Sequence, residues 1–399
     1  MLLRQAEKDV RQAVSDLDAT ESILGDIVAY PTVSAEPNIA LIEHMAERLE
    51  DSGARVEIFR DETGGKANLW GTIGPEGDGG IVLSGHSDVV PVADQDWSMD
   101  PFALTRRDDL LYGRGTCDMK GFIAASIAMA PHFAAQTLKR PVHFCFTHDE
   151  EVGCLGARQL VPQLQARGIR PSIAIVGEPT TMQIIEGHKG CCEYTARFTG
   201  LEGHGSAPDR GVNAVLYAVR YVNRLMELAE ELKHRAPRDT PFDPPWTTVN
   251  VGRLHGGVAH NVIPGKAEVE WEMRPSQYGD AEFVKEQLAQ LVEHDLLPAM
   301  RAVSPWADIT TEVIGEVVGL EPMTENAARD LVRELTGDMD AHTVPFGTEA
   351  GLFQGMGMSV VVCGPGSIAQ AHKPDEYISR PQLQACLDML HGLRRSLAA

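Results

Sequence analysis

Few features of the sequence point to a secreted, membrane-bound or nucleic-acid-binding protein. It has no Cys-x-x-Cys pair, and an odd number of cysteines, seven, argues against a disulfide framework or a cysteine-based structural zinc site. No stretch approaches the roughly 18 apolar residues of a membrane span, and the N-terminal segment is too charged for a signal peptide. Basic residues are scarce, and the net charge of −22 disfavours nucleic acid and anionic membranes as partners. We therefore expect a cytoplasmic protein.

The composition is that of an ordinary globular protein. Hydrophobic residues make up 43% of the chain and charged residues 23%, which allows a large buried core and argues against disorder. A chain of 399 residues is commonly divided into two domains.

Strands and helices are predicted to alternate over about the first 185 residues. Helical periodicity and compact apolar runs carry this prediction, and the apolar strands are typical of a sheet that is covered on both faces. The chain is therefore expected to begin with an α/β domain. The predicted helices are 9–30, 39–49 and 121–135, and the predicted strands are 56–59, 68–70, 81–83, 142–147 and 173–176.

The pattern changes after about residue 188. Residues 266–274 alternate strictly between apolar and charged side chains, which marks a strand with one wet face. The order strand, helix, strand, strand, helix predicts a small ferredoxin-like α+β domain over 188–304, inserted between 1–187 and 305–399. Its predicted strands are 191–198, 247–254 and 266–274, and its helices are 212–232 and 281–293. The remainder is expected to return to α/β structure, with a strand at 359–363 and a helix at 380–397.

Acidic and histidine side chains follow several of the predicted strands. His86 ends one strand, Glu150 and Glu151 follow another, and Glu178 and His372 follow two more. In α/β sheets, functional sites lie at the carboxyl ends of the strands. Taken singly, each has an ordinary explanation, such as a hydrogen-bonded histidine or a solvated acid.

One further acid, Asp118, stands among glycines in Gly113–Gly121, directly before a predicted helix. Together these residues supply two imidazoles and three carboxylates, with Glu150 left over. That set suits zinc, cobalt or manganese better than calcium or magnesium. If one carboxylate bridges, each of two metals has three protein ligands, which is an open catalytic site. Adjacent glutamates can divide the roles of ligand and general base.

These motifs occur in the order found in a known family, and the match spans essentially the whole chain. The sequence resembles the zinc metallopeptidase family that contains acetylornithine deacetylase, succinyl-diaminopimelate desuccinylase, aminoacylase and glutamate carboxypeptidase. The resemblance implies an α/β catalytic domain with two zinc ions at the carboxyl ends of the sheet strands. A smaller α+β dimerisation or lid domain interrupts it. Cobalt could replace zinc.

The resemblance also implies roles for individual residues. His86, Asp118 and Glu178 would bind one zinc ion, and Asp118, Glu151 and His372 the other, so that Asp118 is the bridge. In addition, Glu150 would be the general base and Asp88 the acid that orients His86. The Asp118–Met119 peptide bond is expected to be cis, as in many relatives.

Four more residues match positions that act on the substrate. His204, in GHGSAP, would reach the reacting carbonyl, usually from the partner subunit of a homodimer. Asn261 and Arg274 would contact the substrate carboxylate, and Glu349 would contact either the substrate amine or a residue next to a metal ligand. Ordinary alternatives are a mobile surface histidine for His204, a turn former for Asn261 and an exposed arginine for Arg274.

The implied activity is hydrolysis of the amide bond of an N-acyl amino acid by a water that the two metals share. Residues 347–350 and 364–377 are most similar to the acetylornithine deacetylase branch, which makes N2-acetyl-L-ornithine the expected substrate. Alternatives are a desuccinylase, an acetylcitrulline deacetylase, an aminoacylase or a dipeptidase. A non-catalytic metal- or ligand-binding homologue is disfavoured, because such a protein does not need Glu150.

Overall fold

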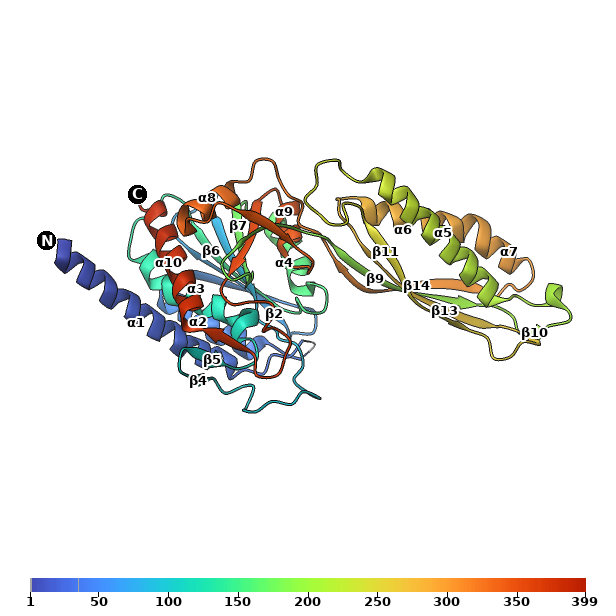
Figure 1. Ribbon diagram of the computed structural model, residues 1–399, viewed down its shortest axis with the longest axis horizontal. Coiled ribbons are helices and arrows are strands. Elements are labelled where there is room, and N and C mark those ends of the chain that lie inside the picture. Colours follow the sequence, from blue (N-terminus) through green and yellow to red (C-terminus); the bar gives the residue numbers. More distant parts are fainter. Residues whose placement is uncertain (1, 35) are drawn as a thin grey trace. The chain divides into compact units, whose positions relative to one another are not determined.

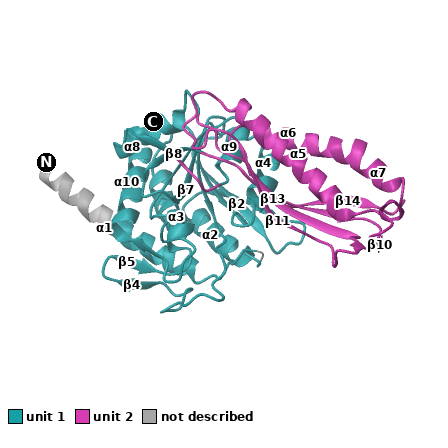
Figure 2. Cartoon of the chain, turned by 45° about the vertical axis from the view of Figure 1, so that its right-hand side comes forward, with its two compact units in different colours: residues 1–187, 323–342, 348–399 teal, residues 188–322, 343–347 magenta. Residues whose placement is uncertain are grey.

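The computed structural model describes residues 2–34 and 36–399, with side chains from residue 15 onward. The chain forms two compact units (Figure 2). Unit 1 comprises the chain up to Gly187 together with residues 323–342 and 348–399, and unit 2 comprises residues 188–322 and 343–347.

Unit 1 is built on an eight-stranded sheet of order β1-β2-β6-β3-β7-β16-β8-β15. Its four central strands, β6, β3, β7 and β16, are parallel, so their carboxyl ends meet at one edge. The strands are β1 (Arg55–Arg60), β2 (Ala67–Ile73), β3 (Ile81–His86), β6 (Val142–Thr147), β7 (Ile173–Pro179), β8 (Ile184–His188), β15 (Ala341–Val344) and β16 (Ser359–Gly364). A small separate sheet contains β4 (Thr105–Arg107), β5 (Leu110–Tyr112) and β17 (Tyr377–Ser379).

Helices cover both faces of this sheet (Figure 1). Leu83, Phe144 and Ile175 belong to a core shared with α3 and its neighbours, whereas Val82 and Val176 are buried on the opposite face. This alternation is what period-two strands produce when each face has its own layer of helices. The helices are α1 (Leu2–Val28), α2 (Ile39–Asp51), α3 (Gly121–Ala134), α4 (Leu155–Ala166), α8 (Ala327–Thr336), α9 (Ala350–Gly355) and α10 (Arg380–Leu397).

Unit 2 is a four-stranded antiparallel sheet of order β11-β13-β9-β14. The apolar residues of β13 are all buried, as the alternating sequence predicts: Ala267, Val269, Trp271 and Met273. Figure 1 shows α5 and α6 side by side along this sheet. The elements are β9 (Cys191–Thr199), β10 (Gly203–His204), η2 (Pro208–Arg210), α5 (Ala214–Arg235), β11 (Thr248–Gly256), β12 (Val262–Ile263), β13 (Lys266–Arg274), α6 (Asp280–Leu291), η3 (Val292–Leu296), α7 (Leu297–Arg301) and β14 (Asp308–Val317).

The second unit extends beyond residue 304, the predicted end of the inserted domain. Strand β14 pairs with β9 along its whole length and completes the order β-α-β-β-α-β of a ferredoxin-like fold. A register shift between Val313 and Gly315 interrupts the strand. Among the described residues, no helix combines the length and the apolar run that crossing a bilayer requires.

Candidate metal centre

The candidate ligands of unit 1 lie at the carboxyl ends of the central parallel strands. His86 is the last residue of β3, Glu178 lies near the end of β7, and Glu151 follows β6. His372 lies in the loop after β16. Asp118 lies in the irregular turn η1 (Thr116–Lys120), directly before α3, and its peptide bond to Met119 is cis, as expected.

Asp118 lies between the two histidines. Its Oδ1 atom is 3.0 Å from Nε2 of His86, and its Oδ2 atom is 3.2 Å from Nε2 of His372. Nε2 of His86 is also 3.8 Å from Oε1 of Glu178, and Nε2 of His372 is 3.0 Å from Oε1 of Glu151. Ligand atoms of a tetrahedral zinc ion lie about 3.3 Å apart. Each of the two histidines therefore lies beside Asp118 and one glutamate. The ligand atoms of His86, Asp118 and Glu151 also lie within 4.8 Å of one another.

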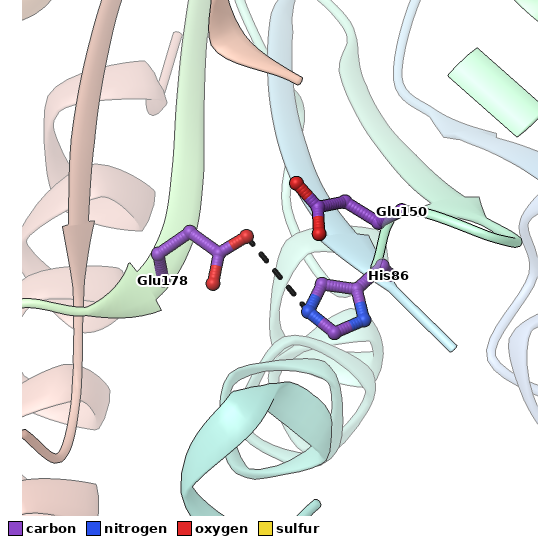
Figure 3. A group of neighbouring side chains, drawn as sticks. All are labelled: His86, Glu150 and Glu178. Atoms are coloured by element: carbon purple, nitrogen blue, oxygen red, sulfur yellow. Dashed lines mark ion pairs between the residues drawn. The ribbon is translucent and has the colours of Figure 1, made fainter. Parts of the chain in front are cut away.

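Glu150 also faces His86 and Glu178, as Figure 3 shows from the three labelled side chains. Ligand atoms of these three residues lie within 4.8 Å of one another. The thiol of Cys154 donates to Oε1 of Glu150 at 3.4 Å. The structure thus brings both members of the Glu150–Glu151 pair to the centre.

The three glutamates of the centre are held in a setting that opposes their negative charge, whereas, against the effect of burial, hydrogen bonds with His372 and His86 lower the pKa of Asp118. Burial raises the pKa of Glu150, Glu151 and Glu178 above the usual range. The charge of Asp118 raises the pKa of Glu151 and Glu178 further, and the charge of Glu151 does the same for Glu150.

The two imidazoles are in a setting that favours their positively charged form. Burial alone would lower the pKa of His86, but Glu178 and Asp118 raise it well above the usual value. Hydrogen bonds with Asp118 and Glu151 raise the pKa of His372 to about 10. The cluster therefore retains protons on groups that must release them to bind a cation, and metal binding is expected to release protons.

A buried lysine, Lys120, lies two residues after Asp118 in the sequence. The Nζ atom of Lys120 donates to the main-chain oxygens of Ile27 and Tyr30.

A donor set of two imidazoles and several buried carboxylates fits zinc or cobalt. The residues present thus meet the chemical requirement for a metal centre.

Asp88 holds the loop that carries the two glutamates. Its Oδ1 atom accepts a hydrogen bond from the backbone N of Glu150 at 3.0 Å, and its Oδ2 atom accepts from that of Glu151 at 3.3 Å. Nδ1 of His86 is closer to the main-chain oxygen of Asp88, at 2.8 Å, than to Oδ1 of its carboxylate, at 3.5 Å. The main-chain oxygen of Asp88, rather than the carboxylate that the resemblance implied, is therefore the nearer partner of His86.

Glu349 lies buried between two strands of the centre. The hydroxyls of Ser84 on β3 and Thr147 on β6 donate to its two carboxylate oxygens at 2.6 and 2.7 Å. The carboxylate of Glu349 is therefore hydrogen-bonded to both of these ligand-bearing strands.

The remaining three candidates belong to unit 2. His204 is exposed on β10, and Asn261 precedes β12, the partner of β10. The backbone N of Gly205 donates to the main-chain oxygen of Asn261 at 2.8 Å, so His204 and Asn261 are neighbours. Arg274 lies at the other end of the unit, as the last residue of β13, and pairs with Glu272. The length of β13, about 26 Å, separates the two ends.

Arg114 and Glu376 form a buried ion pair close to Asp118, and neither was among the predicted site residues. Both lie within motifs that were recognised for their neighbours, in GRGTCDMKG and AHKPDEY. A charged residue beside a candidate ligand was the available signal, but only the structure shows that these two side chains meet.

Comparison with known proteins identifies the family and relatives of this chain. The sequence model of peptidase family M20/M25/M40 matches residues 82–395. The acetylornithine deacetylase of Myxococcus xanthus is 38% identical over 377 residues, covering 93% of this chain and 95% of the relative. The acetylornithine deacetylase of Photorhabdus laumondii is 37% identical over 359 residues, covering 88% and 90%.

Solved structures share the fold at lower sequence identity. An M20 family metallo-carboxypeptidase from Sulfolobus solfataricus superposes with a TM-score of 0.69 at 17% identity, covering 93% of this chain and 97% of that one. The aminopeptidase PepT from Bacillus cereus gives a TM-score of 0.68 at 18% identity, covering 96% and 99%.

Proposed function

The chain belongs to peptidase family M20/M25/M40, and from this premise we propose that it hydrolyses N2-acetyl-L-ornithine to L-ornithine and acetate. The observation that carries the proposal is the position of Asp118, which offers one carboxylate oxygen to each of two histidine-containing groups. The similarity to acetylornithine deacetylases over most of the chain supports the choice of substrate.

Two zinc ions would be held at this centre. His86, Asp118 and Glu178 would bind one, and Asp118, Glu151 and His372 the other. When bound, the ions would polarise the scissile carbonyl and acidify water. The spacing of the ligand atoms and the buried carboxylates support this assignment.

Glu150 is proposed as the group that moves the proton. It lies beside the ligands, with its carboxylate buried near His86. Burial favours the neutral form of the carboxyl group, so Glu150 can accept a proton from the attacking water and return it to the leaving nitrogen. One residue then acts as base and as acid, and Asp88 holds it in place.

Unit 2 is proposed to recognise the substrate and to form a homodimer. Arg274 and Asn261 would bind the α-carboxylate, and His204 would stabilise the oxyanion. The two ends of unit 2 are separated by the length of β13, so one copy of this unit cannot present Arg274 and His204 to the same small substrate. We infer that His204 and Asn261 come from a partner subunit.

The surface of unit 2 supports this assembly. Helix α5 exposes a row of large apolar side chains, Leu216, Val219 and Met226, with exposed fractions of 61%, 39% and 46%. An apolar row of this kind is commonly covered by a partner. Strand β11 lies at the edge of its sheet and is free to pair with a second strand.

A substrate panel tests the proposed function. The zinc-loaded protein is assayed with N2-acetyl-L-ornithine and with formylated and succinylated amino acids and a dipeptide. We expect the highest kcat/KM with N2-acetyl-L-ornithine. A higher value with a succinylated substrate or a dipeptide would contradict the substrate assignment but leave the hydrolase assignment in place. No turnover of any member would overturn both.

A further inference from the structure

The ion pair between Arg114 and Glu376 joins two segments that are far apart in the sequence. Nη1 of Arg114 lies 2.7 Å from Oε2 of Glu376, and each side chain is only 1% exposed. One segment continues into Asp118, and the other begins at His372. The pair therefore connects the bridging carboxylate with the histidine of the second ligand group.

On the Asp118 side, Glu376 fixes the main chain. Its Oε1 atom accepts hydrogen bonds from the backbone N of Cys117 at 2.8 Å and of Asp118 at 3.1 Å. The main-chain oxygen of Glu376 accepts a further hydrogen bond from the backbone N of Gly113 at 3.0 Å. The carboxylate thus sets the backbone from which the Asp118 side chain projects.

On the His372 side, the contacts pass through Gln95. Nη2 of Arg114 donates to Oε1 of Gln95 at 2.5 Å, and Nε2 of Gln95 donates to the main-chain oxygen of His372 at 3.0 Å. Nη1 of Arg114 also donates to the main-chain oxygen of Lys373 at 3.3 Å. The indole ring of Trp97 lies against the guanidinium group, 5.0 Å from its centre.

His372 has few other restraints. It lies outside regular secondary structure, its side chain is 49% exposed, and its φ angle is +62°. A left-handed backbone is uncommon for a residue other than glycine, so its neighbours must hold it there. In contrast, His86 and Glu178 project from the central strands β3 and β7.

We propose that Arg114, Glu376 and Gln95 form a positioning network for the metal site of Asp118, Glu151 and His372, in which Gln95 acts on His372 and therefore on this site alone. This proposal rests on the two-metal centre proposed above. The other site does not depend on Gln95, because its unshared ligands are anchored in the sheet. Loss of the Gln95 contact should therefore weaken one metal-binding step and leave the other intact.

Zinc affinity measured by competition with a chelator of known affinity tests the proposal. We expect Gln95→Ala to weaken one of the two binding steps about 10-fold, the lower end of the range for residues that orient metal ligands. His372→Ala identifies which step belongs to this site. If Gln95 acts through His372, adding Gln95→Ala to His372→Ala should cause no further loss.

Two more variants complete the design. Arg114→Lys keeps the charge but loses the planar fork of donors. Because Arg114 also pairs with Glu376, which holds the backbone of the shared Asp118, this variant should weaken both steps. Glu186→Gln is the control, since Glu186 pairs with Arg329 in the same unit, at 2.7 Å, away from the centre. It should change neither step. If Arg114→Lys does not fold, Gln95→Ala still decides, because Gln95 is only partly buried.

The outcomes separate this inference from the proposed function. Equal weakening of both steps by Gln95→Ala, no weakening, or additive loss in the double variant would overturn the inference alone. A wild-type protein that binds no zinc would overturn the two-metal centre and the inference with it.

Discussion

The carboxylate of Asp88 accepts a hydrogen bond of 3.0 Å from the backbone N of Glu150. Asp88 is fully buried, and Ser34 donates to its other oxygen at 2.7 Å. This side chain therefore joins the end of β3 to the loop that carries the proposed base. The position of Glu150 is set by a residue that is itself neither base nor ligand in the proposed scheme.

Replacing Asp88 by Asn should destabilise the protein. The amide presents an N–H group toward a backbone N–H, which leaves a buried donor unpaired at a cost of about 1–3 kcal/mol. Urea unfolding of the metal-free protein measures this change. Asp78→Asn is the control, because Asp78 is exposed and its ion pair with Arg170 is a long surface pair of 3.9 Å. Equal stability of the two variants would contradict the role given to Asp88.

Glu150→Gln should abolish most turnover without removing metal. General acid–base catalysis by a positioned side chain contributes about 10²–10⁴-fold, so kcat should fall by that factor. Zinc content by elemental analysis should equal that of the wild type, whereas Glu151→Gln should lose zinc affinity. A Glu150→Gln variant with near-normal kcat, or one that loses zinc as Glu151→Gln does, would show that the two roles are assigned wrongly.

Mixing two inactive variants should restore activity if the site is shared between subunits. His204→Ala and Arg274→Ala would each remove one contribution from every site. After random reassortment, half of the dimers are mixed, and each has one intact site, so about a quarter of wild-type turnover should return. Absence of recovery, with exchange verified by differently tagged chains, would place both residues in the same subunit's site.

His143 should make the protein less stable in mild acid. It lies on β6, stacked on Trp70, and burial lowers its pKa to about 4. The folded state therefore excludes a proton that the unfolded chain binds below its usual pKa of about 6.5. Stability from this group is present above about pH 6.5 and is lost as the pH falls toward 4, by ~3 kcal/mol at most.

The measurement is the free energy of unfolding at pH 7 and pH 4.5 for the wild type and His143→Gln. The difference between the two pH values should shrink in the variant. His234 on α5 provides the control, because it lies at an exposed position. A pH dependence that is unchanged in His143→Gln would contradict this assignment.

Local sequence patterns were sufficient to predict most of the strands that position the candidate ligands. Strands β6 and β13 were predicted with the bounds that the structure gives them, because each is a compact apolar or strictly alternating run. The clustering of His86, Glu151 and Glu178 followed from parallel strands ending at one edge of a sheet.

Non-local pairing could not be predicted in the same way. Strand β14 has a register shift between Val313 and Gly315, which breaks the alternation by which β13 was recognised. The hydroxyl groups that donate hydrogen bonds to Glu349 belong to two strands that are distant from Glu349 in the sequence. Similarly, nothing local to His372 shows that Gln95 holds its main chain. Each of these features depends on residues that meet only after folding.

The centre around Asp118 is proposed to bind two metal ions and to hydrolyse N2-acetyl-L-ornithine. The most direct test is acetate release from N2-acetyl-L-ornithine by metal-free protein titrated with zinc. We predict no release without metal, and activity that rises with bound zinc and stops rising when the sites of His86 and His372 are both filled. Acetate release at full rate without zinc, or no release at any zinc content, would contradict the account.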